Sequence, residues 1–324
     1  MPQRGIPCME RPAPIAACLT DGHAGNRRQA EALARALGLE PAPHVPLQPS
    51  PMAKTWSPRS FPGARRALGP AFAEALAAPP EIAIGCGRQG ALATRLLRDA
   101  GSRTVQILDP RIDPAHWDWV IAPAHDGLSG PNVISLEGSL NEVDDAWLDR
   151  ARADFPQLGW FDAPRVALLV GGPGRHWDPG EGEFAAALES VRRAVLAAGG
   201  SLMATASRRT PDSWRRRLAE AGAALAWTGE QDGVNPYRGL LGWANVIVCT
   251  ADSVNMLSEA CATRVPVGVL GMDRLHGRPR AFVEACVRRG RVHPFDGALP
   301  EAGEVTPLRE TARVAAILRP RLLP

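Results

Sequence analysis

The sequence has very little lysine and no long apolar run. Lys54 is the only lysine, so the 37 basic residues are almost all arginine, and the net charge of +3 is too weak to predict a nucleic-acid partner. No stretch approaches the roughly 20 apolar residues that a membrane-spanning helix needs. Residues 1–14 are rich in proline and carry no continuous apolar core, which argues against a signal peptide and predicts a disordered tail.

Paired cysteines are also absent. The six cysteines are scattered and none forms a C-x-x-C pair, which argues against zinc-binding and thioredoxin-like folds. Cys18 and Cys249 fall in predicted strands, where a free thiol acts as a small apolar residue, and we expect a protein of the reducing cytosol. Because no spacing resembles a set of metal ligands, the sequence predicts neither a metal nor another cofactor.

A strand, a polar turn and a helix recur along the chain. Its 324 residues are enough for two domains of about 150 residues, each with its own core. The charged stretch 140–164 marks the predicted junction. We therefore expect an α/β protein with an N-terminal Rossmann-like domain over residues 15–160 and a C-terminal one over residues 161–324.

The stretch 245–270 organises the C-terminal half. The short apolar run 246–249 predicts a buried strand, and Pro266 ends the following helix before a second strand. Such a βαβ unit builds a parallel sheet. Asp252 or Ser253 is the predicted N-cap of the helix, whose unpaired N–H groups and positive dipole end favour an anion.

Glu259 lies on this helix and is a candidate ligand for a ribose. Open α/β sheets bind ligands outside the carboxyl ends of their strands, and a carboxylate there can accept hydrogen bonds from two ribose hydroxyls. The alternative, from the residues alone, is a capped helix with a solvated glutamate.

Two more loops of the C-terminal half follow predicted strands. The strand 165–170 runs into Gly171 and Gly172, whose bare backbone allows either a phosphate to approach or a tight turn. The strand 201–205 precedes Ser207 and Arg208, where a guanidinium would neutralise a diphosphate. Solvated arginines at a helix start are the alternative, and the position at a strand end favours the binding role.

The N-terminal half begins with a predicted strand over residues 15–20. It runs into a polar turn that carries Asp21, Gly22, His23 and Gly25 before a helix. His23 is a candidate general base and Asp21 its orienting carboxylate, acting on a hydroxyl acceptor. Turn residues that cap the helix with their side chains are the alternative.

A second glycine-rich turn follows the strand predicted over residues 81–85. Gly87, Arg88 and Gln89 open the next helix and are placed to meet an acceptor or a phosphate. Neither turn has the G-x-G-x-x-G spacing, so the sequence does not predict a dinucleotide fold.

The proline-rich segment after the short strand 44–47 is predicted to be a long loop. It carries both aromatic and basic residues, namely Lys54, Trp56, Arg59, Phe61, Arg65 and Arg66. Such a loop suits contact with a membrane surface or a lipid-linked acceptor, and an ordinary solvated loop is an equal alternative.

The pattern of Ser253, Glu259 and Pro266 between two buried strands resembles the nucleotide-sugar-binding unit of GT-B glycosyltransferases. A narrower resemblance, over about residues 19–295, is to the mitochondrial fission (elongated mitochondria) protein family, whose plant members act in mitochondrial division and which has many bacterial relatives. Six ordered segments carry it: DGHAGNRRQA, GCGRQGA, LLVGGPGRHW, TASRRTP, NPYRGLLGWAN and TADSVNMLSEACATRVPV. The sequence departs from this family at His23, where many relatives have lysine or arginine, and at Arg264, where glycine often follows the threonine.

The GT-B resemblance implies two Rossmann-like domains facing each other across a cleft, with the last helix packing back on the N-terminal domain. It implies a nucleotide-sugar site in the C-terminal domain and acceptor-side loops in the N-terminal domain. It also implies transfer without a metal, because backbone amides, a helix dipole and arginine stabilise the departing diphosphate. The implied nucleotide-sugar-binding residues are Gly171, Gly172, Ser207, Arg208, Ser253, Asn255, Met256 and Glu259.

The resemblance implies two classes of function. One is a glycosyltransferase that uses a nucleotide-sugar donor and a cell-envelope glycan or lipid-linked acceptor, in the cytoplasm or peripherally at the inner membrane. The other is a non-catalytic adaptor that recruits a dynamin-like GTPase to a membrane. The arginine-rich and alanine-rich composition suggests a bacterial chain, and this favours the enzyme.

Overall fold

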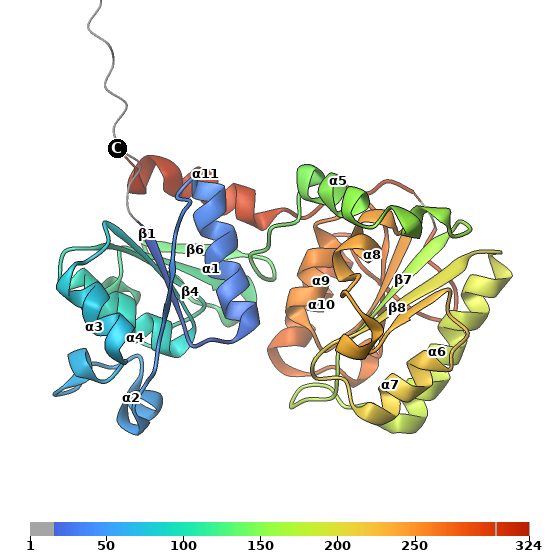
Figure 1. The fold of residues 1–324 in the computed structure, drawn as a ribbon, viewed down its shortest axis with the longest axis horizontal. Coiled ribbons are helices and arrows are strands. Elements are labelled where there is room, and N and C mark those ends of the chain that lie inside the picture. The colour runs from blue at the N-terminus through green and yellow to red at the C-terminus, as the bar shows by residue number, and fades with distance from the viewer. Residues whose placement is uncertain (1–15, 302, 324) are drawn as a thin grey trace, which may run out of the picture. The chain divides into compact units, whose positions relative to one another are not determined.

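The computed structural model describes residues 16–301 and 303–323, so the tail predicted over residues 1–14 lies outside it. The chain forms two compact units. The first contains the residues up to 122 together with 129–134 and those from 314 onward, and the second contains 123–128 and 135–313. In each unit, helices cover both faces of a central sheet (Figure 1).

The first unit is built on a six-stranded sheet of order β2-β1-β3-β4-β5-β6. The pairs β1–β2, β1–β3, β3–β4 and β4–β5 are parallel. The strands are β1 (Ala16–Thr20), β2 (His44–Pro46), β3 (Ile82–Cys86), β4 (Arg103–Ile107), β5 (Trp119–Pro123) and β6 (Val133–Leu136). The helices are α1 (Ala24–Leu37), α2 (Pro51–Trp56), α3 (Pro70–Ala77), α4 (Gly87–Arg98) and the later part of α11 (Glu310–Leu322), with short 3-10 turns η1 (Ala64–Arg66) and η2 (Pro114–His116).

The second unit repeats this plan with the strand order β12-β11-β10-β7-β8-β9, and each neighbouring pair is parallel. Its strands are β7 (Arg165–Val170), β8 (Ser201–Ala206), β9 (Leu225–Trp227), β10 (Val246–Thr250), β11 (Val267–Leu270) and β12 (His293–Pro294). Its helices are α5 (Asp145–Asp154), α6 (Gly180–Ala197), α7 (Asp212–Ala219), α8 (Tyr237–Trp243), α9 (Val254–Cys261) and α10 (Gly277–Arg288), with η3 (Ala124–Asp126), η4 (Pro156–Trp160), η5 (Glu230–Asp232) and η6 (Met272–Arg274).

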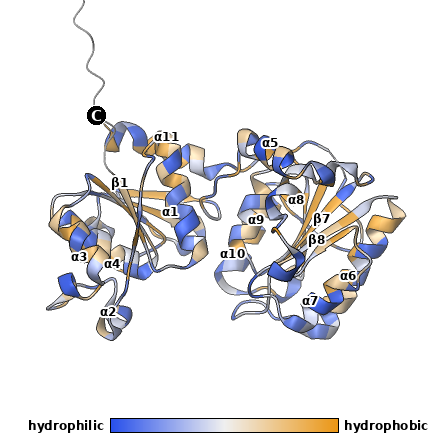
Figure 2. Cartoon of the chain, in the orientation of Figure 1, coloured by the Kyte–Doolittle hydropathy of each residue, from blue (hydrophilic) through white to orange (hydrophobic). Residues whose placement is uncertain are grey.

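The central strands are buried on both faces. Every residue of β1, β3 and β10 is buried, and β7 and β8 expose only their first residue in part. Because helices cover both faces of these strands, the strand sequences are continuous apolar runs in which polar and apolar residues do not alternate. Figure 2 shows this as apolar colour along the strands and mixed colour on the covering helices. The predicted α/β fold with two Rossmann-like sheets is confirmed.

Two helices are absent from the sequence prediction. The segment predicted as a long loop contains α2, which begins with Ser50 as N-cap and Pro51 at the first helical position. The charged stretch at the predicted junction contains α5, where the side chain of Asp144 accepts a hydrogen bond from the N–H of Trp147 at 2.7 Å. Both helices begin with ordinary capping residues. The many prolines of the first segment and the many charges of the second made these signals hard to recognise in the sequence.

The described cysteines are buried free thiols, namely Cys18, Cys86, Cys249, Cys261 and Cys286. Burial raises the pKa of the Cys18 thiol to about 12. The prediction that Cys18 and Cys249 act as small apolar residues in strands is therefore confirmed. Within residues 16–301 and 303–323, no helix combines the length and apolarity needed to cross a bilayer.

Candidate functional site

The candidate donor site lies where the strand order of the second unit reverses. From β7 the chain moves to β8 and β9 on one side of the sheet, then returns to β10 and β11 on the other side. In open α/β sheets ligands bind outside the carboxyl ends of the strands at such a point, so the edge formed by the loops after β7 and β10 is the candidate crevice. The loop after β8 borders the same edge of the sheet.

The side chain of Asp252 joins these three loops. It is only 3% exposed and lies just beyond β10. Its Oδ2 accepts hydrogen bonds from the N–H of Gly172 at 3.1 Å and from Nη2 of Arg209 at 2.6 Å. Its Oδ1 accepts a hydrogen bond from the hydroxyl of Thr250 at 2.6 Å. A buried carboxylate needs such partners, and here they come from the loop after β7, the loop after β8 and the last residue of β10.

Gly171 and Gly172 are held tightly within this arrangement. A Cβ at Gly171 would lie 2.2 Å from both carboxylate oxygens of Asp252, and one at Gly172 would lie 2.2 Å from the carbonyl oxygen of Arg209. The N–H of Gly171 donates to Oγ1 of Thr250 at 2.8 Å. Both glycine amides thus already have acceptors within the protein, and the close approach that requires glycine here is made by Asp252 and Arg209.

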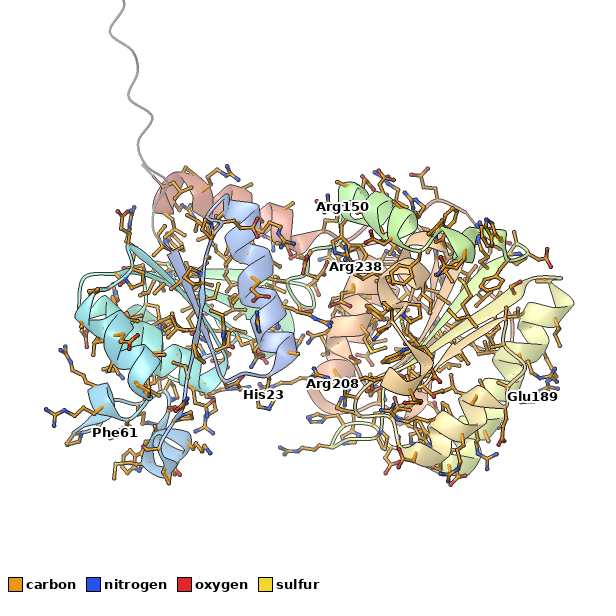
Figure 3. All side chains as sticks on the ribbon, viewed as in Figure 1. His23, Phe61, Arg150, Glu189, Arg208 and Arg238 are labelled. Atoms are coloured by element: carbon orange, nitrogen blue, oxygen red, sulfur yellow. The ribbon has the colours of Figure 1, made fainter. Side chains whose placement is uncertain are left out.

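The two adjacent arginines of the loop after β8 have different environments. Arg209 bonds to Asp252, and its N–H donates to Oγ of Ser207 at 3.2 Å. Arg208 is exposed on the loop between β8 and α7 (Figure 3), and within the described part of the chain it makes no ion pair. The guanidinium of Arg208 is therefore available to an anion at this edge of the sheet, whereas that of Arg209 neutralises a buried carboxylate.

The loop after β10 leads directly into α9. Ser253 is the N-cap in extended conformation, and its Oγ accepts a hydrogen bond from the N–H of Met256 at 3.4 Å. Asn255 and Met256 lie half-buried in the first turn. The predicted N-cap is thus confirmed, and the helix start points its dipole toward the crevice.

Glu259 lies half-buried further along α9. It accepts a hydrogen bond from the hydroxyl of Tyr237, which is the only tyrosine of the chain. Tyr237 begins α8, and its N–H donates to Oδ1 of Asn235 at 2.9 Å. The helix starts at Tyr237, and Asn235 holds its first N–H. The contact orients the carboxylate of Glu259.

A cavity of about 300 Å³ opens beside Thr250 in the same unit. Its walls come from α6, from the loop between β7 and α6, and from the loops after β11 and β12, and they include Trp177, Phe184 and Phe295. None of the predicted donor-site residues lines it. The cavity therefore does not support the donor assignment, which depends on the crevice edge.

In the first unit, the strand order reverses between β1 and β3. Asp21 follows β1 and is the centre of the turn. Its carboxylate accepts hydrogen bonds from Nδ2 of Asn26 at 3.0 Å to each oxygen and from the N–H of His23 at 3.1 Å. Nδ1 of His23 lies 3.1 Å from the same Oδ1, and the imidazole is 80% exposed (Figure 3). The two candidate catalytic residues are thus in direct contact.

The turn after β3 meets this group. Gly87 has φ +80°, and a Cβ there would lie 2.7 Å from Nδ2 of Asn26 and 3.0 Å from Oδ2 of Asp21. Gly22 also has positive φ, but its surroundings are open. Gly25 lies within the first turn of α1. The structure therefore brings the two predicted acceptor-side turns together at one sheet edge.

Arg88 has a different place from its neighbours. Its guanidinium donates to the carbonyl oxygen of Ser57 at 2.7 Å and 3.0 Å and to that of Thr55 at 3.0 Å. These bonds fix the end of α2, so the charge of Arg88 is engaged with backbone carbonyls. Gln89 is half-buried in the first turn of α4.

The residue types of the site also bear on metals. Among residues 16–301 and 303–323, no group of three or more His, Cys, Asp or Glu side chains is arranged to hold a metal ion. The oxygens of Asp252 already accept hydrogen bonds from an arginine, a hydroxyl and an amide. The site therefore offers a ligand mainly hydrogen-bond donors.

Two solved structures have similar folds. The UDP-GlcNAc 2-epimerase of Methanocaldococcus jannaschii matches with a TM-score of 0.54 and 14% identity, covering 94% of this chain and 99% of that one. The Os79 protein of O. sativa, solved in complex with UDP, matches with a TM-score of 0.51 and 13% identity, covering 93% of this chain and 90% of that one. These matches show a GT-B-like fold.

The sequence itself identifies the family. Mitochondrial fission protein ELM1 of Arabidopsis thaliana is 30% identical over 276 residues, which cover 75% of this chain and 64% of the plant protein. The match thus spans less than two thirds of that relative's length. The family model described as mitochondrial fission ELM1 matches residues 24–322. The chain therefore belongs to the mitochondrial fission ELM1 family.

Proposed function

We propose that the protein is a metal-independent glycosyltransferase whose nucleotide-sugar donor binds at the crevice edge of the second unit. The observation that carries this proposal is that α9 has a capped start, whose N–H groups suit an anion, and an oriented carboxylate on the same helix. Ser253 caps the start, and Glu259, six residues later, is held by Tyr237. At 1.5 Å per residue, the two groups are separated by about 9 Å along the helix axis. The helix start would face the diphosphate, with Asn255 and Met256 beside it, and Glu259 would accept the ribose hydroxyls.

The diphosphate would also be neutralised from the loop after β8. Arg208 is exposed and makes no ion pair among the described residues, and Ser207 offers a hydroxyl at the same strand end. Gly171 and Gly172 border the same crevice, and their amides would reach a phosphate only by exchanging their present acceptors. An arginine and a helix N-terminus are groups that stabilise the charge of a departing diphosphate.

The acceptor would bind to the first unit, in the turns that carry Gly22, Gly25, Gly87, Arg88 and Gln89. We propose a cell-envelope glycan or a lipid-linked molecule, and a cytoplasmic protein that contacts the inner membrane peripherally. The ordered contact between Asp21 and His23 supports a base that deprotonates the acceptor hydroxyl.

We expect His23→Ala to lower turnover by roughly 10²–10⁴-fold, the usual contribution of a general base, and to leave donor affinity unchanged. Asp21→Asn should lower turnover as well, because it weakens the contact that orients the imidazole. The measurement is a steady-state rate with a separate calorimetric donor titration. Full turnover by both variants would place the base elsewhere.

A second function is supported by a different observation. Both glycine amides at the crevice are engaged within the protein, so the donors that commonly contact a phosphate are already occupied. This favours a GT-B-like scaffold without transferase activity. Together with the fission family it supports an adaptor that recruits a dynamin-like GTPase to a membrane.

A ligand panel separates the two functions. UDP, GDP, ADP, CMP and their sugar conjugates are tested by thermal shift and calorimetry on the whole chain. A ligand that binds only the folded state at about 100 times its Kd adds roughly 2.7 kcal/mol of stability. A nucleotide hit supports the transferase. Silence across the panel, with capture of a membrane-bound GTPase by the same protein, would support the adaptor.

A further inference from the structure

The first unit carries an excursion, residues 50–67, that is closed at its base. The N–H of Gln48 donates to the carbonyl oxygen of Leu68 at 2.9 Å, and that of Ser50 donates to Ala67 at 2.8 Å. Between these bonds lie α2 and η1. The guanidinium of Arg88 anchors the end of α2 to the body of the unit. The excursion is therefore a structured projection.

One face of α2 is apolar and exposed. Ala53 is fully buried beneath the helix, while Met52 is 54% exposed and Trp56 is 53% exposed. These two side chains are four residues apart and therefore lie on one face of the helix. Among the described residues the other exposed large apolar side chains, Trp160, Leu196 and Val234, lie on three separate segments. In the described part of the chain, Met52 and Trp56 form the one such pair on a single element.

The charged residues of the segment that carries this pair are all basic. From residue 41 to residue 73 the chain has no aspartate or glutamate and four basic residues, Lys54, Arg59, Arg65 and Arg66. All four are exposed, and none makes an ion pair within the described part of the chain. This interval alone accounts for the net positive charge of the protein, since the rest of the chain has slightly more acids than bases.

We propose that the excursion 50–67 docks the protein on an anionic lipid surface, with Met52 and Trp56 entering the headgroup region and the four basic residues facing anionic headgroups. Tryptophan is enriched at membrane interfaces, and basic residues are attracted to an anionic leaflet within a Debye length. The apolar pair and the basic residues lie on one anchored projection, an arrangement that suits contact with an extended anionic surface. The inference does not depend on nucleotide binding and is tested without it.

The structure changes what the sequence suggested for this segment. Phe61 is half-buried and packs against the core of the first unit, so it is part of the anchor of the excursion. Met52, which the sequence did not single out, takes its place at the surface because α2 sets it one turn from Trp56.

The test measures partition of the whole chain onto vesicles of phosphatidylcholine with phosphatidylglycerol, compared with phosphatidylcholine alone. We expect binding to the mixed vesicles that weakens in high salt. Lys54→Gln/Arg59→Gln should lower partition roughly 25-fold, from about fivefold per basic residue. Met52→Ser/Trp56→Ser should lower it roughly tenfold, from half-burial of two apolar side chains. Trp160→Ser, at a tryptophan that is 82% exposed, should bind like the wild type.

Vesicles that carry brominated acyl chains give a second readout. Insertion of Trp56 would quench part of the tryptophan emission, and Trp56→Phe should abolish that change while Trp160→Phe retains it. Equal partition of wild type and both double variants would overturn the proposal. Equal binding to vesicles with and without phosphatidylglycerol would also overturn it. So would a pull-down in which an acidic protein competes fully with the vesicles for the excursion.

Discussion

Replacing Glu259 with alanine should lower nucleotide affinity by roughly ten to a hundredfold and leave the folded structure in place. A hydrogen bond to a charged group contributes about 1.5–3 kcal/mol, and the carboxylate is proposed to accept bonds from a ribose. Glu259 is half-buried at the surface of α9 and outside the apolar core. The measurement is a calorimetric titration with the nucleotide that the panel identifies.

Three comparisons make this result specific. Inorganic pyrophosphate has no ribose, so its affinity should be the same for wild type and Glu259→Ala. Tyr237→Phe removes one bond that orients the carboxylate, and we expect only a few-fold loss. Glu284→Ala on α10 removes an exposed carboxylate paired with Arg280 at 2.7 Å, and should change nothing. Equal loss of pyrophosphate binding would show that Glu259 acts through the phosphate site or the fold.

Most of the fold could be predicted because each parallel strand of this protein is a short apolar run that can be recognised from its own sequence. The runs that become β1, β7 and β10 are buried over nearly their whole length, so each is visible without its neighbours. Polar or glycine-rich turns then mark the sheet edge that binds ligands. The helices that were missed, α2 and α5, each bury only a few residues, so their pattern of core-facing residues is weak in the sequence.

The site could be predicted only in part, because its partners are distant in sequence. Ser253 was found since an N-cap is a local pattern. Asp252 and Arg209 are 43 residues apart, and nothing in either segment indicates which of the two adjacent arginines will contact Asp252. Tyr237 lies 22 residues before Glu259 on another helix. Such pairs become visible once the parallel sheet has brought the ends of β8, β9 and β10 to one edge.

The departure at Arg264 also has a structural explanation. Its guanidinium bonds to Asp145 at 3.0 Å and to Glu304 at 2.9 Å. Arg309 bonds to the same carboxylate at 2.6 Å, and Arg309 and Arg264 together hold the pKa of Asp145 far below its usual range. The position serves a surface ion network at the start of α5, a role that exposed pairs fill with little gain in stability.

The largest effect on stability is expected from Gly171→Ala. The added Cβ would lie 2.2 Å from both oxygens of the Asp252 carboxylate, well inside contact distance. That carboxylate is 3% exposed and is held by Gly172, Thr250 and Arg209, so it cannot move aside without losing partners. Overpacking usually costs about 1–3 kcal/mol, and loss of a partner by a buried charge adds to it. We expect a loss of roughly 3 kcal/mol or more in the free energy of unfolding of the second unit.

Two controls identify the contact as the cause. Gly182→Ala in the first turn of α6 has no atom within 4 Å of the added Cβ, and should be neutral or stabilise by up to about 1 kcal/mol. On an Asp252→Ala background the clash is gone, so Gly171→Ala should then cost far less. Equal cost in both backgrounds, measured by calorimetric melting, would place the strain elsewhere. A strongly reduced cost would show that glycine is required at position 171 by the protein's own carboxylate, whether or not a phosphate ever approaches it.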